Sequence, residues 1–599
     1  MNDLTNYFSD QRLVRILCRK RIDVARKARR EQFICSIAST SGSRRPTNAL
    51  CSMLPPRRAW NSFRPSASAR RDPSIDAPTR LAHQMANHVL TELARTTARY
   101  RWVVRLRTFL DTIRSRALNW ISTDSYTFDD IHAFPKNRPG NGEKYRIVAS
   151  YSLSSSLICS GFASYLRDRI DSVLRPGVLA FRSAPPDGGK PPSHHNAIET
   201  IVNMVDATPI SSDIWCAEVD IEGFFDAVSH DVAMRETKRV LSWTNHPIDP
   251  RLLAFLESFF RGYDFVGSAV QTAKLKLAKH GVTTPKFASP EKALRERGLL
   301  TNPSGRIGIP QGSSMSCVLA NIVLSAADTL VSATIEAKGE RGEGLYLRYC
   351  DDIIIMSRRK ETCDEALNTY ISALRSLKLP YHPPKEIAIY PGIRQHEKNH
   401  PMGWFWDGKS KASYPLSSSN TGKSVPWLAF VGYQVNRAGR VRVRKSSINK
   451  ELTKQRHVAI DIIYALRKVA QKKRRRMVVH AIQDVRIVQY RAMMHLLSIG
   501  VGYPPEWSTK PAPGAVSWSN GFRGMPPHRA VVEPLRRLDM GRMRVLQYLK
   551  RRINRMIKGG LLTIKSAPPA SATGSALTPV IPKFRLKFAG PPLSYRYQF

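Results

Sequence analysis

The stretch LYLRYCDDIIIMS, residues 345–357, places two adjacent aspartates in the middle of an otherwise apolar run. Its pattern predicts two buried strands, LYLRY and IIIMS, with Asp351 and Asp352 at the tip of the hairpin that joins them. Two neighbouring carboxylates are costly to bury unless their charge is compensated. Taken alone, the stretch also fits an exposed turn in which Asp-Asp merely suits the backbone.

A second acidic segment, IWCAEVDIEGFFDAVSHD at residues 214–231, lies upstream. Its first residues predict a short strand that ends at Asp220, and Ser229 is a typical N-cap for the next helix. If Asp220 lies beside the hairpin tip, three carboxylates converge there. Hard divalent cations, Mg²⁺ above all, neutralise such an all-oxygen site. Two ions about 4 Å apart stabilise the attacking and leaving oxygens of a phosphoryl transfer.

The charge of the chain indicates a polyanionic partner. Lys and Arg total 94 against 47 acidic residues, which gives a net charge of +47 over 599 residues. Nucleic acid is the first candidate and an anionic membrane the second. We expect no membrane partner, because no uninterrupted apolar run is long enough to span one. The eight cysteines form no CxxC pair, so we expect no zinc site and no disulfide framework, and a cytoplasmic location fits.

The organisation of the chain changes along its length. The Arg-rich N-terminal segment RLVRILCRKRIDVARKARREQ predicts a short helix and then a linker; it suits a nucleic-acid arm better than an organelle transit peptide. A helical period follows, then alternating strands and helices over about residues 130–440. After residue 446 the pattern is helical and very basic, with a Pro/Gly-rich interruption at 502–527.

Six collinear motifs resemble those of reverse transcriptases. Tyr349-Cys350-Asp351-Asp352 resembles the YxDD box, DIEGFFD the first palm motif, and GIPQGSSMSCVLANIVL, residues 308–324, the GxPQGxxxSPxLAN motif. Downstream, LKLPYHPPKE resembles the fourth motif and FVGYQVNRAGRVRVRKSSI the hairpin that grips the primer. Upstream, GEKYRIVAS is similar to the fingers segment. One such motif is weak evidence, but six in order are specific.

The resemblance implies an α+β fold, the right-hand polymerase of fingers, palm and thumb, with a basic helical C-terminal extension. The parts that we expect are a basic N-terminal arm and linker (1–80), N-terminal helices and fingers (81–210), a palm (211–445) with a fingers insertion at about 245–305, a helical thumb and C-terminal extension (446–560) and an extended tail (561–599).

The resemblance also implies roles for the acidic residues and their neighbours. Asp220 and Asp351 would hold two Mg²⁺ ions, with Mn²⁺ as an alternative, and Asp352 would assist. The Ile221 carbonyl would be a further metal ligand. Phe225 matches the steric-gate aromatic residue that excludes a ribonucleotide 2′-hydroxyl; its alternative role is simple core packing.

Other site residues follow from the remaining motifs. Gln311 and Gly312 match the loop that contacts the nascent base pair and the template backbone. Lys144 and Arg146 would clamp the triphosphate, and the alternative is solvated surface charge. Lys385 matches the lysine that serves as general acid for departing pyrophosphate.

The activity that the resemblance implies is RNA-directed DNA synthesis, with an RNA template, dNTPs and a DNA product. No cysteine follows Cys363, which argues against the endonuclease of mobile group II intron enzymes. The remaining resemblance is to stand-alone bacterial enzymes of phage defence, including abortive-infection types, which use a noncoding RNA or a protein primer. Cys317 stands where the family usually has proline.

Several alternatives stay open at this point. The chain resembles a group II intron reverse transcriptase or maturase less closely, and an RNA-templated RNA polymerase would share the palm and metals. A nucleic-acid-binding scaffold without synthesis would need no carboxylate site, so the three aspartates argue against it. A homo-oligomer and a partner protein are both compatible with the sequence.

Overall fold

The computed structural model divides the chain into two compact units. Unit 1 comprises Met1–Leu13 and Phe109–Val441, and unit 2 comprises Val14–Thr108 and Arg442–Phe599. The boundaries fall within helices α1 (Asp10–Ala38) and α5 (Arg101–Leu118) and strand β12 (Val441–Val443). The residues that the structure describes are 3–38, 49–63, 77–119, 131–137, 144–185, 191–244, 247–279, 281–282, 285–287, 296, 306–338, 343–389, 404–405, 409–417, 425–475, 528–529, 531 and 533–559.

A four-stranded antiparallel sheet, in the order β5-β6-β3-β9, organises unit 1. Strands β5 (Gly344–Tyr349) and β6 (Asp352–Ser357) form the hairpin that the sequence predicts. Strand β3 (Trp215–Glu218) lies between β6 and β9 (Lys411–Pro415). Because β3 and β6 are antiparallel, the end of β3 and the β5–β6 turn share one edge of the sheet.

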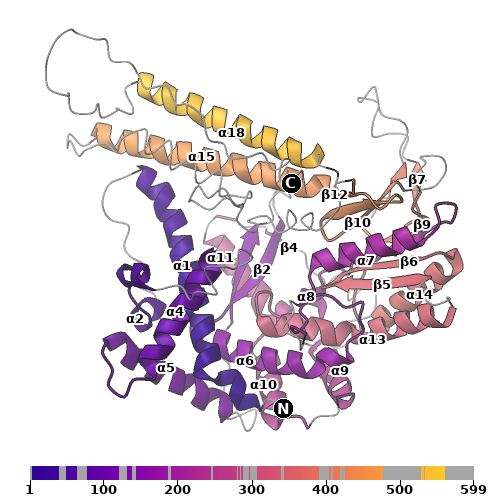
Figure 1. The fold of residues 1–599 in the computed structure, drawn as a ribbon, viewed down its shortest axis with the longest axis horizontal. Helices are drawn as coiled ribbons and strands as arrows, with labels where there is room; N and C mark the ends of the chain where they lie inside the picture. The colour runs from indigo at the N-terminus through magenta and orange to yellow at the C-terminus, as the bar shows by residue number, and fades with distance from the viewer. Residues whose placement is uncertain are drawn as a thin grey trace. The chain divides into compact units, whose positions relative to one another are not determined.

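Helices cover the two faces of this sheet (Figure 1). Helix α14 (Lys360–Ser376) packs against β3, β6 and β9, and α13 (Ser314–Lys338) packs against α14 and β5. On the other side α7 (His194–Ala207) contacts β5 and β11 (Tyr433–Asn436). Ser193 caps α7 in a capping box with Asn196. Unit 1 thus has the α+β character that the sequence predicts.

Helix α13 is the one described helix that is long and apolar enough to cross a membrane by length and composition. Most of that apolar stretch is buried within the protein, in contact with α6, α9 and α14. A core helix that is covered on several sides has the same composition as a membrane span, because both avoid water.

The remaining elements of unit 1 are shorter. The hairpin of β10 (Trp427–Phe430) and β11 is the segment that resembles a primer grip. The others are η1 (Leu4–Phe8), α6 (Leu153–Ile170), η3 (Asp171–Val173), α8 (Phe224–Ala227), α9 (His230–Ser242), α10 (Pro250–Arg261), β7 (Ala388–Ile389) and β8 (Trp404–Phe405).

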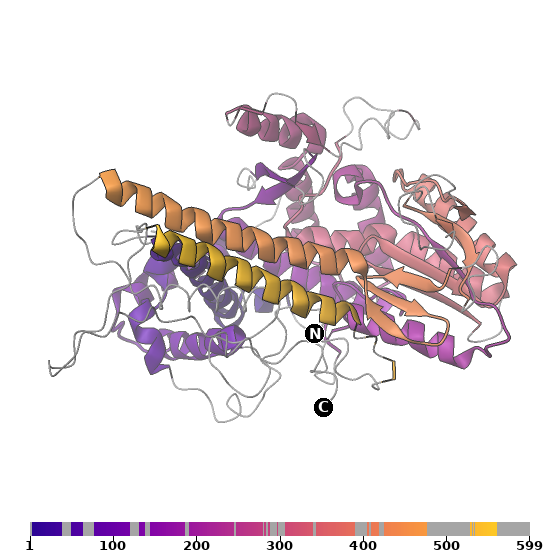
Figure 2. The ribbon, with the colours of Figure 1, turned by 90° about the horizontal axis from the view of Figure 1, so that it is seen from above.

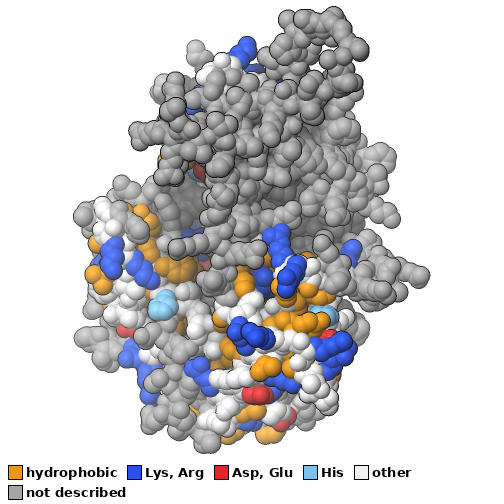
Figure 3. Space-filling view, turned by 90° about the vertical axis from the view of Figure 1, so that its left-hand side faces the viewer, with side chains coloured by type: hydrophobic (Ala, Val, Ile, Leu, Met, Phe, Trp, Pro, Cys, Tyr) orange, Lys and Arg blue, Asp and Glu red, His pale blue; other side chains and the backbone are white. Residues whose placement is uncertain are grey.

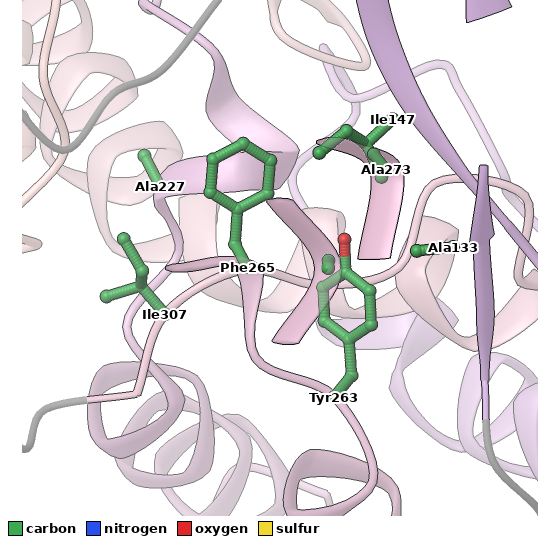
Figure 4. Packing of buried hydrophobic residues seen from close by; sticks show 8 residues of the cluster. Ala133, Ile147, Ala227, Tyr263, Phe265, Ala273 and Ile307 are labelled. Carbon is green, nitrogen blue, oxygen red and sulfur yellow. The ribbon is translucent and has the colours of Figure 1, made fainter. Parts of the chain in front are cut away.

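A second small sheet packs on a cluster of buried residues (Figure 4). Strands β1 (His132–Asn137) and β2 (Lys144–Ser150) are antiparallel, and β2 also pairs with β4 (Lys286–Phe287). Ala133 and Ile147 from these strands meet side chains of the π-helical turn η4 (Phe265–Ala269) and α11 (Val270–Ala278). Ile307 also packs in this cluster. It therefore fixes the start of the GIPQG loop, residues 308–312. Of the fingers insertion expected at about 245–305, the part at 288–305 lies outside the described residues, apart from Glu296.

Gly308 follows this cluster in a conformation that favours glycine. Its φ is +95°, and a Cβ added there would lie 2.6 Å from the Cβ of Phe265. We expect Gly308→Ala to lower the free energy of unfolding by about 2–4 kcal/mol, from backbone strain and overpacking together. The urea midpoint of the purified variant measures it.

Gly281→Ala is the matched control for this prediction. Gly281 also has a positive φ, +79°, but a Cβ there meets nothing within 4 Å. It carries the backbone strain without the clash. Equal losses of stability in the two variants would show that the contact with Phe265 is unimportant.

Apart from the end of β12, the regular elements described in unit 2 are helices. The basic N-terminal segment forms a helix of 29 residues, α1, which corrects the expected short helix. Val14, Cys18 and Ile22 are buried at four-residue spacing, so α1 contributes a core face instead of a free arm. The other N-terminal elements are α2 (Ala49–Met53), η2 (Arg57–Ser62) and α4 (Ala77–Leu93).

Two long basic helices, α15 (Lys445–Arg475) and α18 (Glu533–Lys558), lie side by side in unit 2 (Figure 2). Both were predicted from the sequence as basic helices. Gly541 of α18 lies directly against the Leu452 side chain of α15, where any Cβ would clash. Buried residues such as Leu538, Val545 and Leu549 form the apolar face of α18. The expected tail at 561–599 and the Pro/Gly-rich stretch at 502–527 lie outside the described residues.

Candidate active site

Asp220 and Asp351 meet at the edge of the central sheet. Trp215 pairs with Ser357 and Ala217 with Ile355, and this register, continued past the end of β3, brings Asp220 to the β5–β6 turn. Burial raises the pKa of Asp351, and the negative charge of Asp220 raises it further. The positive charge of Arg146 acts in the opposite direction. Asp220 and Arg146 are therefore both close enough to Asp351 for their charges to change its pKa.

A buried arginine supports the turn that carries Asp351. The Arg348 side chain is fully buried and donates two hydrogen bonds to the Asp328 carboxylate, at 2.7 and 2.6 Å. It also donates to the Cys350 carbonyl at 2.9 Å and to the Asn321 side chain at 3.1 Å. Burial alone would lower the pKa of Arg348, but Asp328 more than offsets this and the pKa is raised. Arg348 therefore keeps its positive charge next to the β5–β6 turn.

Cys350 occupies the strained position of the turn. Its φ of +61° is unusual for a residue other than glycine. Burial raises the pKa of the Cys350 thiol to about 12, so the thiol stays protonated at neutral pH. Cys350 is therefore a small turn residue here and has no activated thiolate.

Asp220 has a lysine and a histidine beside it that the sequence did not reveal. Its Oδ2 lies 3.2 Å from Lys409 Nζ and 3.4 Å from His382 Nε2. His382 also donates its main-chain N–H to the Asp220 carbonyl at 3.0 Å. His382 belongs to the motif LKLPYHPPKE, and this position within a recognised motif could have marked it as a candidate site residue. Lys385, the expected general acid, is exposed, and its main chain pairs with Lys411 of β9.

The oxygen donors at this edge suit a hard divalent cation. Asp352 is exposed, and no group of three or more His, Cys, Asp or Glu side chains among the described residues is arranged to hold a metal. The structure therefore groups two carboxylates, not three. The main-chain hydrogen bonds on either side of Ile221 run from His382 N–H to the Asp220 carbonyl and from Glu222 N–H to the Pro380 carbonyl. Neither of these two bonds uses the Ile221 carbonyl. Two carboxylates and a carbonyl form a donor set that Mg²⁺ prefers.

Phe224 and Phe225 differ in their surroundings. Phe224 is 2% exposed and packs in the core, whereas Phe225 is half-buried. Their rings lie edge to face, with centroids 5.3 Å apart. The Phe225 carbonyl accepts a hydrogen bond of 2.7 Å from Ile309 N–H. Phe225 thus has a partly accessible ring that is tied to the GIPQG loop.

Gln311 and Gly312 lie against strand β2. The Gln311 carbonyl accepts a hydrogen bond from Ala149 N–H at 2.9 Å. Gly312 has a φ of +112°, and a Cβ there would lie 3.1 Å from the Ala149 carbonyl oxygen. Arg146, on the same strand, is exposed. Lys144 begins β2, but its side chain lies outside the described part of the structure.

Two histidines at the start of α7 join the hairpin to the segment that resembles a primer grip. The His194 ring lies 6.1 Å from the Tyr349 ring and 6.1 Å from the Tyr433 ring. Burial, with His195 next to it, lowers the pKa of His194 to about 4. His194 is therefore uncharged at neutral pH. No motif in the sequence singled out these histidines.

A family model described as "Reverse transcriptase (RNA-dependent DNA polymerase)" matches residues 189–403, which include Asp220, Gln311 and Asp351. No curated protein matches the chain.

Solved structures of yeast telomerase are similar to the chain. One, from Candida albicans in complex with a TWJ fragment of telomeric RNA, is 10% identical, covers 80% of this chain and 72% of its own, and has a TM-score of 0.33. Apo telomerase from Candida tropicalis is 11% identical, covers 80% and 77%, and has a TM-score of 0.32.

The family match and the carboxylate site coincide in unit 1. The matched segment spans strands β3, β5 and β6 and the turn that carries Asp351. The chain therefore contains a reverse transcriptase domain, and the protein is an RNA-directed DNA polymerase.

Proposed function

We propose that the protein copies an RNA template into DNA from dNTPs with two Mg²⁺ ions, and that it has the right-hand arrangement of such polymerases. The meeting of Asp220 and Asp351 at one sheet edge carries this proposal, because burial and the charge of Asp220 both disfavour the ionised form of Asp351, and a bound metal ion would offset both effects. Bound Mg²⁺ would neutralise charge on the attacking and leaving oxygens.

The chain's own groups would position the substrates. Asp220, Asp351 and the Ile221 carbonyl would hold the metal ions, with Asp352 at the rim. Arg146 is exposed on β2, and its charge acts on the pKa of Asp351. Its guanidinium group would bind the triphosphate.

Basic surface supports a nucleic-acid partner. The face in Figure 3 carries many Lys and Arg side chains between hydrophobic ones, and few acidic side chains. Near the start of α5, Arg99, Arg101 and Arg105 are exposed beside Tyr100, which is 46% exposed. Contacts of this kind to phosphates give affinity that falls steeply with salt.

The direct test supplies a poly(rA)–oligo(dT) primer-template, labelled dTTP and Mg²⁺. We expect incorporation that stops when the chelator EDTA is added and resumes with excess Mg²⁺. Incorporation on a DNA template alone, with none on RNA, would contradict the proposal.

Phe225→Ala is expected to admit ribonucleotides. Removal of the half-buried ring opens the space for a 2′-hydroxyl, and one such contact changes selectivity by about 10- to 200-fold. The ratio of kcat/KM for dTTP to that for UTP measures it. Phe225→Tyr, which keeps the ring, is the control and should retain the wild-type ratio. An unchanged ratio in Phe225→Ala would assign the ring to core packing.

We further propose a role in bacterial phage defence, with a noncoding RNA or a protein as primer. The motif resemblance and the basic helices α15 and α18 support this setting. Protein purified with its copurifying nucleic acid is given labelled dNTPs without a primer, before and after RNase treatment. Loss of product after RNase would indicate an RNA template or primer, and product that stays attached to protein would indicate a protein primer.

A comparison of phage plaques tests the biological role. Host cells that carry the wild-type gene with its flanking DNA should form fewer plaques than cells with an Asp351→Asn variant. Equal plaque numbers would favour the alternative of a mobile group II intron enzyme, whose test is splicing and mobility of the flanking RNA.

A further inference from the structure

Asp226, the last residue of DIEGFFD, has no role in the site described above. Its side chain is 5% exposed, and its Oδ1 accepts a hydrogen bond of 2.9 Å from Gln311 Nε2. A carboxylate in such a position costs free energy unless its hydrogen bonds are made. The contact joins the segment after β3 to the GIPQG loop across 85 residues of sequence.

The loop is fixed to Phe225 at a second point. Ile309 N–H donates to the Phe225 carbonyl, and Gln311 is anchored two residues later by its side chain on Asp226. The Gln311 carbonyl accepts from Ala149 N–H on β2. Phe225 and Gln311 are therefore held relative to each other by main-chain and side-chain bonds, and both are held relative to the strand that carries Arg146.

The chemistry of the contact orients the Gln311 amide. A carboxylate oxygen only accepts hydrogen bonds, so the amide nitrogen of Gln311 must face Asp226. This leaves the amide oxygen and one N–H of Gln311 for a further partner. Gln311 is partly exposed, so that partner can come from outside the protein.

We propose that Asp226 is a positioning residue that sets the selection of deoxynucleoside triphosphates. It holds the Gln311 amide in one orientation while the residue before it carries the Phe225 ring, so that the sugar of the incoming nucleotide meets a fixed ring and a fixed amide. Without the Asp226 carboxylate the amide rotates, and both binding and discrimination weaken. This inference rests on the proposed DNA synthesis and adds a determinant of its substrate choice.

Kinetics of three variants test the role of Asp226. We expect Asp226→Ala to raise the KM for dTTP about 10-fold and to lower the dTTP-to-UTP ratio of kcat/KM about 10-fold, as loss of one buried hydrogen bond implies. The kcat at saturating dTTP should change much less. Asp226→Asn should stay near wild type, because its Oδ1 still accepts from Gln311. Equal losses in Asp226→Asn and Asp226→Ala would overturn the proposal.

Asp171→Ala serves as the matched control for loss of a partly buried carboxylate. Asp171, at the start of η3 in unit 1, accepts a hydrogen bond from Arg182 at 2.8 Å. Its removal should lower the urea midpoint without changing the dTTP-to-UTP ratio. A changed ratio in this variant would show that general destabilisation alters selectivity, and would overturn the specific role of Asp226.

A double-mutant cycle with Gln311 shows whether Asp226 acts through that residue. Gln311→Met keeps the length of the side chain and removes the hydrogen bond, so it should reproduce the loss of discrimination even if Asp226→Ala does not fold. Adding Asp226→Ala to Gln311→Met should cause no further loss. Wild-type discrimination in Gln311→Met, or a full further loss in the double variant, contradicts the inference.

The wild-type enzyme separates this inference from the proposed function. If it incorporates no dTTP on poly(rA)–oligo(dT), the proposed function fails. If it incorporates dTTP with strong discrimination and the variants discriminate equally well, only the role of Asp226 fails.

Discussion

Asp351→Asn is expected to lower DNA synthesis by about 10³-fold or more, because the loss of one metal-binding charge removes several kcal/mol of transition-state stabilisation. The amide has nearly the size of the carboxylate, so the β5–β6 turn should stay folded. RNA binding should also be retained. Initial rates of dTTP incorporation and fluorescence anisotropy with labelled RNA measure the two quantities on the same protein.

Asp213→Asn is the control for this prediction. Asp213 is exposed and lies before β3, so the substitution makes the same change of charge away from the site. It should leave the rate unchanged. Full incorporation by Asp351→Asn would remove the assignment of the metal site to this sheet edge.

Arg348→Met should strongly destabilise unit 1. It leaves the Asp328 carboxylate, whose side chain is 1% exposed, without its cation in the core. Loss of one partner of a buried ion pair costs about 3–5 kcal/mol. Urea unfolding measures the loss, and Arg348→Lys should recover part of it, because a lysine keeps the charge but not the two-pronged geometry.

The double variant Arg348→Met with Asp328→Leu separates stability from positioning. Apolar replacement of both partners is often neutral for stability, so the urea midpoint should return toward wild type. The rate of synthesis should stay low, because the Cys350 carbonyl has lost its donor at the strained position of the turn. Recovery of both quantities would mean that Arg348 serves packing alone.

The sequence predicted the features that local patterns determine. The hairpin around Asp351, the strand before Asp220 and both long basic helices follow from apolar spacing and motif order. The roles of the site residues remain predictions that the variants above test.

Contacts between distant segments could not be predicted in this way. Lys409 reaches Asp220 because Ser410 Oγ accepts the Asp220 N–H, a contact between residues 190 apart in sequence. Asp328 meets Arg348 because α13 packs on β5, and spacing alone does not indicate which acidic residue of a helix faces a strand. The length of α1 was missed because its many arginines obscured a narrow apolar face.

The strand order β5-β6-β3-β9 has a consequence for synthesis of the protein itself. Trp215 pairs with Pro415, so about 200 further residues must be synthesised before both edges of β3 can be paired. At ribosomal rates of 5–20 residues per second this takes roughly 10–40 s. During that interval a nascent chain exposes an unpaired strand edge, and until residue 351 is made it carries Asp220 without Asp351. Such long-range pairing folds slowly and is prone to aggregation, so expression at lower temperature or with chaperones should raise the soluble yield.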